Sequence, residues 1–318
     1  MDQSAKGGRT MAVIAVIPAR YASTRFPAKP LAADTGKPLI QHTWEQVRRA
    51  QRVDRVIVAT DDDRIADAVA SFGAEARLTR ADHPNGTCRV AEVAGGMGLA
   101  DDDLVLNVQG DEPELDPAVL DRLVARMERC GRSSVDTRGS CRSARPDALA
   151  RSREAGVPGG DPGMNTPDPR VGQPLPPCDI GTLACPFPAD SPAEGPGSPK
   201  DPNCVKVVLD AAGRALYFSR SLLPYPRGDR GAVLDPSRWL LHLGVYAFRP
   251  AVLAAITSSA AESPLAKAEA LEQLAWLESG RTLAVEVVPP QPPGIDTPED
   301  YAAFVARVRG GSAVLNTG

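Results

Sequence analysis

Short apolar runs alternate with amphipathic stretches through the first 130 positions of the chain. Residues 12–17 are all apolar and end at Pro18, as is typical of a short strand buried on both faces of a sheet. The strand pattern occurs at residues 12–17, 54–60, 76–79 and 104–108, and helical spacing occurs at residues 38–51, 61–72, 87–94 and 117–129. This alternation predicts an α/β fold with a doubly wound, mostly parallel, Rossmann-like sheet.

The regular alternation stops after residue 130. Residues 131–202 hold 14 of the 31 prolines and show little apolar periodicity outside residues 180–185. We therefore predict that residues 131–177 form an inserted, mostly disordered surface segment. The predicted organisation is a loose leader at residues 1–11, a single α/β domain over residues 12–309 that carries this insertion, and a tail at residues 310–318.

Regular patterns resume beyond the insertion with two strands around a short turn. Residues 204–209 and 215–219 flank a turn that contains Gly213, which predicts a hairpin. The remaining patterns predict strands at residues 240–248 and 281–288 and helices from Pro250, from Pro264 to Gly280, and after Pro298. We expect these elements to add a smaller, mixed β subregion to the sheet.

Composition and charge narrow the classes of function. The 318 residues carry a net charge of -4 with Lys and Arg dispersed among acids, so no basic face is expected for nucleic acid or a membrane surface. No apolar run reaches the roughly 20 residues of a membrane-spanning helix, and residues 1–10 are too polar for a signal peptide. We expect a cytoplasmic protein. The six cysteines and three histidines form no C-x-x-C or H-E-x-x-H pattern, which disfavours structural zinc and a disulfide framework.

The loop after the first predicted strand concentrates cations. Arg20, Arg25 and Lys29 follow that strand with the hydroxyls of Ser23 and Thr24, at the place where open α/β sheets bind ligands. Arginine can bridge two phosphate oxygens and lysine adds a compact charge, so the loop favours a polyphosphate. A solvated basic loop is the alternative, but the position after the strand argues against it. The chain has no G-x-G-x-x-G or P-loop motif, which disfavours nicotinamide and P-loop enzymes.

Two further segments carry aspartates at places suited to a metal ion. Asp111 follows the strand at residues 104–108, and Asp296 precedes the last helix. Mg²⁺ prefers one or two carboxylates completed by phosphate oxygens and water, which predicts Mg²⁺ as a cofactor. The alternatives are a helix N-cap for Asp296 and a turn role for Asp111.

Nine ordered blocks closely resemble the 3-deoxy-manno-octulosonate (Kdo) cytidylyltransferases, or CMP-Kdo synthetases. The resemblance covers residues 12–130 and 178–309. The blocks are VIPARYASTRFPAKP (16–30), VATD (58–61), TRADH (79–83), NVQGDEP (107–113), NCVKVV (203–208), YFSR (217–220), HLGVY (242–246), LEQL (271–274) and DTPED (296–300). The resemblance implies a nucleotidyltransferase that moves CMP from CTP to the anomeric hydroxyl of Kdo, for lipopolysaccharide-type glycan biosynthesis. Family members are commonly homodimers.

The resemblance also implies roles for individual residues. The residues implied to bind the phosphates of CTP are Arg20, Ser23, Arg25 and Lys29. Those implied to contact the base are Arg80 and residues 85–87, which include Asn85 and Gly86. Asp111 and Asp296 are implied to bind Mg²⁺, and with Lys29 and Arg20 they make up the expected catalytic set. The implied Kdo contacts are Gln109, Arg220, His242, Tyr246, Glu272 and Gln273.

The implied Kdo contacts agree with the chemistry of an acid sugar, which needs a cation for its carboxylate and hydrogen-bonding groups for its hydroxyls. Arg220 is the expected carboxylate clamp. His242 and Tyr246 share a strand face because side chains repeat every two residues, although a core histidine is the alternative for His242. A solvated helix face is the alternative for Glu272 and Gln273.

Two departures from the family pattern bear on these roles. Ala28 stands where the family usually has glycine, which matters if the position needs a positive φ. Asn85 and Cys88 replace a common serine and glutamate, which weakens the prediction of base contacts there. The alternative functions are a cytidylyltransferase for another acid sugar, such as sialic acid, and a catalytically silent CTP-binding protein.

Overall fold

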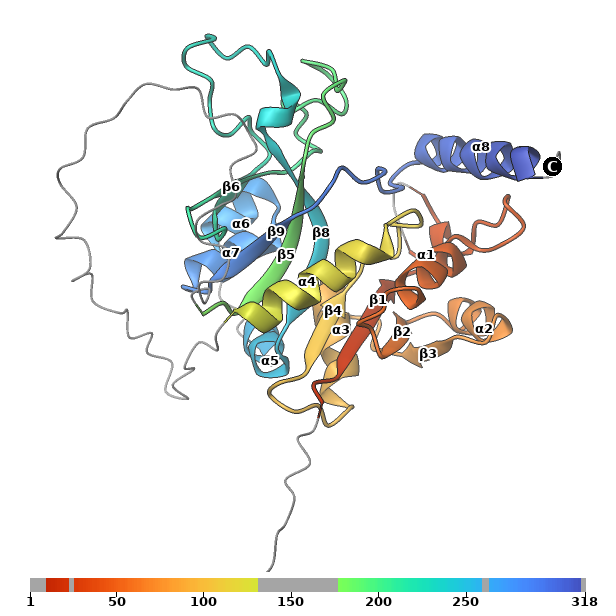
Figure 1. The fold of residues 1–318 in the computed structure, drawn as a ribbon. Helices are drawn as coiled ribbons and strands as arrows, with labels where there is room; N and C mark the ends of the chain where they lie inside the picture. Colours follow the sequence, from red (N-terminus) through yellow and green to blue (C-terminus); the bar gives the residue numbers. More distant parts are fainter. Residues whose placement is uncertain (1–9, 23–25, 131–176, 259–262, 316–318) are drawn as a thin grey trace, which may run out of the picture.

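The computed structural model describes residues 10–22, 26–130, 177–258 and 263–315, with side chains described up to residue 310. Nearly all of the predicted leader and insertion lies outside the described residues, as do Ser23 and Arg25. Figure 1 shows one continuous sheet with helices on both of its faces. Along the sheet, the strands follow the order of residues 75–78, 55–60, 13–19, 104–107, 240–248, 180–186 and 283–287, and a short hairpin of residues 206–209 and 215–219 pairs with the strand at residues 240–248.

The first half of the chain forms the predicted parallel layer. Its strands are β1 (Val13–Ala19), β2 (Arg55–Thr60), β3 (Glu75–Leu78) and β4 (Leu104–Asn107), all mutually parallel. The connecting helices are α1 (Leu39–Arg48), α2 (Asp63–Ser71), α3 (Gly86–Gly95) and α4 (Pro117–Arg129). Asp62 caps α2 by accepting a hydrogen bond from the Arg64 amide, and Gly73 ends that region with a φ of 77°.

The second half completes a mixed sheet. Its strands are β5 (Ile180–Pro186), β6 (Lys206–Leu209), β7 (Ala215–Ser219), β8 (Leu240–Phe248) and β9 (Leu283–Val287). β8 is antiparallel to both β4 and β5, whereas β5 and β9 are parallel. The predicted hairpin is confirmed as the antiparallel pair of β6 and β7. The fold class is therefore the predicted one, a mostly parallel α/β sheet with a mixed subregion.

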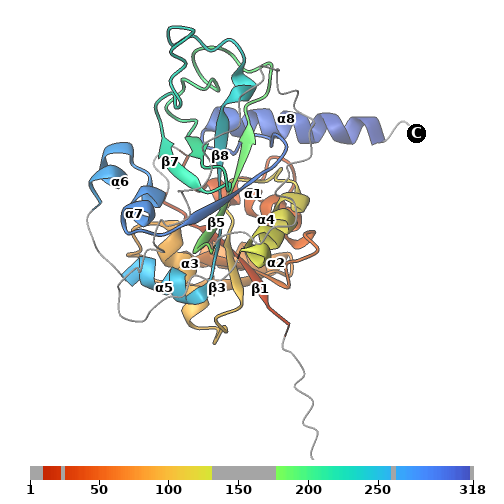
Figure 2. The same ribbon diagram turned by 60° about the vertical axis from the view of Figure 1, so that its left-hand side comes forward.

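Two apolar layers sandwich the sheet. One contains buried side chains of α1, α2 and α4, such as Trp44, Ile65 and Leu120. The other contains side chains of α3, α5 (Pro250–Ser258) and α7 (Glu272–Glu278), such as Val90, Leu253 and Leu274. Figure 2 shows α3, α5 and α7 on the side of the sheet opposite to α4 and α1. This is the doubly wound arrangement expected from the sequence.

The prediction of one helix from Pro264 to Gly280 is wrong. The segment forms α6 (Pro264–Glu269) and α7, with Ala270 between them in the left-handed region at a φ of 50°. Arg220 donates hydrogen bonds to the carbonyl oxygens of Glu269 and Ala270, at 2.6 and 3.3 Å. These contacts satisfy carbonyls that the end of α6 leaves unpaired, so tertiary structure fixes a break that the sequence of the segment does not show.

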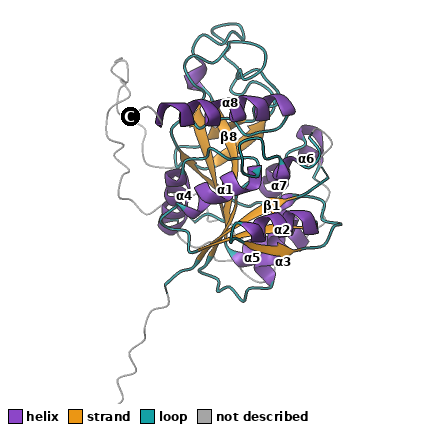
Figure 3. Ribbon diagram, turned by 90° about the vertical axis from the view of Figure 1, so that its right-hand side faces the viewer, coloured by secondary structure: helices purple, strands orange, loops and turns teal. Residues whose placement is uncertain are grey.

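The predicted tail also differs, because α8 (Pro298–Leu315) continues past residue 309. Figure 3 shows α8 running across the molecule above α1. Its first turns pack Tyr301, Phe304 and Val305 against Leu39 and Ile295. None of the helices in the described part of the chain is long and apolar enough to cross a membrane.

Candidate active site

The loops that follow β1 and β4 leave the sheet side by side at its carboxyl edge. The two strands are parallel neighbours with Val16 beside Asn107, so both loops leave at the same edge of the sheet, although β1 continues to Ala19 while β4 ends at Asn107. Gly110 allows the loops to approach, since a Cβ atom there would lie 3.1 Å from the Pro18 carbonyl oxygen. Close approach of these loops positions Lys29 to donate to Asp111 Oδ2 at 2.8 Å. The structure thus places two predicted site residues in direct contact.

The segment before α8 joins the same contact. Lys29 Nζ donates to the Ile295 carbonyl oxygen at 2.7 Å, and the Ile295 amide donates to the Asp111 carbonyl oxygen at 2.9 Å. Lys29 and Ile295 are 266 positions apart in the chain. The loop after β1, the loop after β4 and the segment that holds Asp296 therefore meet at one point of the sheet edge.

A third carboxyl group, which the sequence analysis did not single out, lies at this meeting point. Burial raises the pKa of Glu112 to about 8, with further contributions from the charges of Asp111 and Asp296, while Lys29 opposes the rise. Asp111 and Asp296 are therefore near enough to the same carboxyl to repel its negative charge. The sequence shows Glu112 only as an acid in a turn, and its burial depends on the distant segment around Gly294.

The N-cap of α8 is Thr297 and not Asp296, so the alternative role considered for Asp296 does not apply. Thr297 Oγ1 accepts from the Asp300 amide at 3.1 Å, and Asp300 Oδ2 accepts from the Thr297 amide at 2.8 Å. This reciprocal pair is a capping box. Asp296 therefore lies one residue before the N-cap, near enough to Glu112 for its charge to raise the pKa of that carboxyl group.

A pocket of about 230 Å³ opens between the end of β1 and the start of α3. We call it the β1–α3 pocket, and its lining residues are Pro18, Ala19, Arg20, His83, Pro84, Asn85, Gly86, Arg89 and Gln109. Gly86 brings α3 close to β1, because a Cβ atom there would lie 3.1 Å from Pro18 Cγ. Four of the predicted site residues, Arg20, Asn85, Gly86 and Gln109, thus share one pocket.

Other residues near this pocket differ from the sequence-based expectations. Arg80 is exposed, does not line the pocket and pairs with Asp82 at 2.9 Å. The sequence analysis missed Arg89, whose buried guanidinium forms an ion pair with Asp61 at 3.0 Å. This pair connects α3 with the carboxyl end of β2. The sequence signal that could have identified this pair is Asp61 itself, which ends the VATD block.

His242 and Tyr246 lie on one face of β8, as predicted. Their ring centroids are 5.5 Å apart, although a bulge in β8 lies between them. Thr182 and Leu183 are adjacent in β5, but their partners in β8, Tyr246 and Leu243, are three positions apart. The bulge therefore adds two residues to β8. Because side chains alternate between faces, two extra residues leave His242 and Tyr246 on the same face. Burial lowers the pKa of His242 to about 3, and its Nε2 contacts Thr182 Oγ1 at 2.9 Å. The imidazole is thus a neutral hydrogen-bonding group near pH 7.

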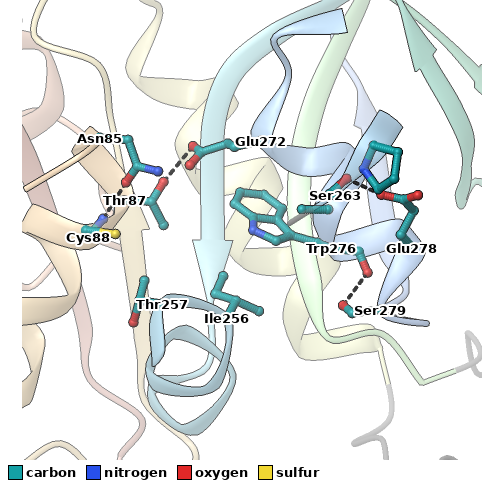
Figure 4. A pocket seen from close by; sticks show the side chains of 12 residues that line it. Asn85, Thr87, Cys88, Ile256, Thr257, Ser263, Glu272, Trp276, Glu278 and Ser279 are labelled. Carbon is teal, nitrogen blue, oxygen red and sulfur yellow. Dashed lines mark hydrogen bonds between the residues drawn. The ribbon is translucent and has the colours of Figure 1, made fainter. Parts of the chain in front are cut away.

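Glu272 and Gln273 begin α7 and do not lie on a solvated face. Gln273 is buried, and burial raises the pKa of Glu272, an effect that a hydrogen bond from Thr87 partly offsets. Glu272 lines a second pocket, of about 330 Å³, between α3, α5 and α7 (Figure 4). We call it the α3–α7 pocket. It adjoins the β1–α3 pocket, since Asn85 lines both.

Arg220 makes extensive contacts within the protein. Besides its two bonds at the end of α6, its Nη1 donates to the Pro202 carbonyl oxygen at 2.8 Å. The sequence analysis missed Lys206, which is fully buried and donates to three carbonyl oxygens, including that of Arg220 at 2.6 Å. Arg220 therefore connects β7, the loop at Pro202 and the turn between α6 and α7, and its expected role as a carboxylate clamp remains a prediction.

Ala28 adopts the backbone conformation that makes its departure from the family pattern matter. Its φ is 58° and its ψ is 17°, in the left-handed region that disfavours residues with a Cβ atom. The Ala28 amide donates to the Tyr21 carbonyl oxygen at 3.1 Å. A strained residue thus lies immediately before Lys29.

An open α/β sheet with a basic loop after its first strand and acidic groups at the same edge fits the nucleotidyltransferase expected from the sequence. A family profile described as cytidylyltransferase matches residues 14–144 and 191–283. Curated relatives named 3-deoxy-manno-octulosonate cytidylyltransferase include one from Syntrophotalea carbinolica, 39% identical over 94% of this chain and 100% of its own length. Another, from Syntrophobacter fumaroxidans, is 40% identical over 93% of this chain and 96% of its own length. The chain belongs to the 3-deoxy-manno-octulosonate cytidylyltransferase family.

Solved structures agree with this placement. A structure of CMP:2-keto-3-deoxy-manno-octonic acid synthetase complexed with CTP has a TM-score of 0.70 and 32% identity, and covers 94% of this chain and 99% of that one. A 4-diphosphocytidyl-2C-methyl-D-erythritol synthase from Anaerococcus prevotii has a TM-score of 0.51 at 13% identity, over 94% of this chain and 96% of its own. The second likeness concerns the fold alone.

Proposed function

We propose that the protein transfers CMP from CTP to the anomeric hydroxyl of Kdo and releases pyrophosphate. The observation that carries this proposal is the contact of Lys29 with Asp111 and Ile295, because it joins three distant segments at the carboxyl edge of the sheet. Ligands of open α/β sheets bind at that edge. The product, CMP-Kdo, is an activated acid sugar suited to lipopolysaccharide-type glycan synthesis.

We assign the triphosphate of CTP to the cations of the loop after β1. Lys29 supplies a compact charge at the meeting point, and Arg20, in the wall of the β1–α3 pocket, can bridge phosphate oxygens. The base is assigned to the same pocket, whose wall includes Asn85 and Gly86. Arg80 contributes less, because its guanidinium is already paired with Asp82.

The acidic groups at the sheet edge fit Mg²⁺. Mg²⁺ takes as few as one or two carboxylates from a protein. Asp111 and Asp296 would hold it, and phosphate oxygens and water would complete its shell. When bound, the ion would neutralise charge that develops on the phosphates.

The reaction needs no nucleophile from the protein. The anomeric hydroxyl of Kdo loses its proton to solvent as its oxygen bonds to the α-phosphorus of CTP. The bond from that phosphorus to the bridging oxygen breaks, and pyrophosphate leaves with the bridging oxygen. Lys29 and Arg20 stabilise the negative charge on the departing pyrophosphate, and the polar groups near the α3–α7 pocket orient the sugar. Positioning and charge stabilisation thus account for the chemistry.

Product analysis tests this function directly. Purified protein is incubated with CTP, Mg²⁺ and Kdo, and the expected products are equal amounts of CMP-Kdo and pyrophosphate. Reactions without Kdo, or with sialic acid in its place, are expected to release little pyrophosphate. Tight CTP binding without turnover, or faster turnover with sialic acid, would contradict the proposal.

A further inference from the structure

A chain of polar side chains connects the two halves of the active site. Thr87 Oγ1 donates to Glu272 Oε1 at 2.6 Å, as Figure 4 shows, and accepts from Asn107 Nδ2 at 3.3 Å. Asn107 Oδ1 in turn accepts a long bond from Gln109 Nε2, at 3.5 Å. The chain thus begins at Gln109, in the β1–α3 pocket, and ends at Glu272, in the α3–α7 pocket.

Thr87 is the central member of this chain and faces away from the β1–α3 pocket. It is 2% exposed, and Asn107 is fully buried. Thr87 lines the α3–α7 pocket and is absent from the wall of the β1–α3 pocket, although its neighbours Asn85 and Gly86 line that wall. The hydroxyl of Thr87 is directed to Glu272 on α7, and the expectation that residues 85–87 lie against the base remains a prediction.

The bond from Thr87 is of the strong kind. A hydroxyl that donates to a carboxylate at 2.6 Å makes a charge-assisted hydrogen bond, about twice as strong as a neutral one. A glutamate side chain can rotate about three torsion angles, so its carboxylate can take many positions. A hydrogen bond from a buried partner to one carboxylate oxygen limits these rotations and so fixes where the other oxygen lies. The carboxylate of Glu272 is thereby oriented from α3, a helix of the nucleotide half.

We propose that Thr87 is a positioning residue for Kdo that acts by orienting Glu272. Thr87 follows directly after Asn85 and Gly86 on α3, so the backbone that forms the wall of the β1–α3 pocket also sets the position of Glu272. This inference rests on the proposed function, because it assigns Glu272 to the sugar. It adds a residue whose effect on Kdo passes through a second side chain.

The test compares Thr87→Val with Thr87→Ser. Valine keeps the shape of threonine and removes the hydroxyl, whereas serine keeps the hydroxyl. Thr87→Val is expected to raise the KM for Kdo about tenfold or more and to change the KM for CTP less than about twofold, because the strong bond it removes is the one to Glu272, whereas the bond it loses from Asn107 is longer, at 3.3 Å. Thr87→Ser is expected to restore most of the affinity for Kdo.

Several outcomes would overturn the inference. In a folded, active Thr87→Val protein, a KM for Kdo within about twofold of the wild type would do so. Equal rises in both KM values would indicate a general structural role instead, as would failure of Thr87→Ser to restore Kdo binding. Absence of CMP-Kdo synthesis by the wild type would overturn the proposed function and this inference together, so the two failures are distinguishable.

A double-mutant cycle tests the contact without reference to activity. The midpoint of thermal unfolding is measured for the wild type, Thr87→Val, Glu272→Ala and the double variant. If the hydroxyl acts through Glu272, Thr87→Val shifts the midpoint less in the Glu272→Ala background than in the wild type. Shifts that simply add would show that the contact does not operate in solution and would contradict the inference.

Discussion

The sheet edge near Lys29 and the region around His242 differ in how they are prepared to bind a ligand. At the sheet edge, charged groups remain partly exposed: the side chains of Lys29 and Asp111 are 14% and 29% exposed. Around His242, the side chains are buried and held near neutrality, with the pKa of His242 near 3 and that of Tyr246 raised well above its usual value. The first region is suited to a polyanion and the second to a sugar recognised by shape and hydrogen bonds.

The two regions also differ in the range of the interactions that build them. The sheet edge follows from the parallel pairing of β1 and β4, whose loops must emerge together. The sugar side depends on the antiparallel strand β8, its bulge, and the break between α6 and α7 that Arg220 helps to hold. Substitutions in the two regions should therefore have separable effects on CTP and on Kdo.

The largest effect is expected from Asp111→Asn and Asp296→Asn. Each substitution removes a negative charge at the carboxyl edge, and we expect turnover at saturating Mg²⁺ to fall about 10²- to 10³-fold. Pyrophosphate release measures this effect. Glu114→Gln is the matched control, because Glu114 lies close by in sequence but pairs with Arg307 on the surface. Turnover near that of the wild type in either aspartate variant would contradict the metal assignment.

A smaller effect concerns the pH dependence of stability on the sugar side. His242 titrates near pH 3 in the folded protein and near pH 6.5 when unfolded. Between these values the unfolded chain binds more protons, so the free energy of unfolding decreases as the pH falls from about 6.5 towards 3. His242→Gln is expected to flatten this dependence, measured by urea unfolding at several pH values.

The flattening will be partial, because burial also lowers the pKa of His42, which remains in the variant. Its contribution has the same sign as that of His242. Parallel curves for the wild type and His242→Gln would show that the His242 ring is not enclosed in solution.

The smallest effect is expected at Ala28. Ala28→Gly removes the unfavourable Cβ contact of a left-handed residue, which stabilises the folded protein. Glycine also gives the unfolded chain more freedom, which cancels part of this gain. The free energy of unfolding should therefore rise by about 0.5–1 kcal/mol. Ala33→Gly is the matched control: Ala33 is an exposed residue of the same loop region without a positive φ, and the change should destabilise. A loss of stability in Ala28→Gly would contradict the assignment of strain.

The sequence predicts the sheet edge better than the sugar side, for physical reasons. Apolar runs such as residues 12–17 specify buried strands, and the ends of parallel strands specify where loops meet. The sequence shows apolar periodicity at residues 180–185 but no strand is predicted there, whereas the structure has β5, in which Gly181 fits closely against Met127. Tertiary contacts that no local pattern contains decide such positions.

The same reasoning applies to individual site residues. Lys29 and Asp111 could be found from their places after strands, whereas the burial of Glu112 and the link of Thr87 to Glu272 required contacts between distant segments. The break at Ala270 has no local signal, because alanine favours helix. The roles assigned to Ser23 and Arg25 lie outside the described residues and remain predictions.

The central claim is that the loop after β1 and the segment before α8 bind the same triphosphate. A double-mutant cycle of Lys29→Met and Asp296→Asn on the affinity for CTP, measured calorimetrically with Mg²⁺, tests it most directly. We predict that each substitution weakens binding and that the double variant departs from additivity by at least about 0.5 kcal/mol. Additive effects, or an Asp296→Asn protein that binds CTP as the wild type does, would contradict the claim.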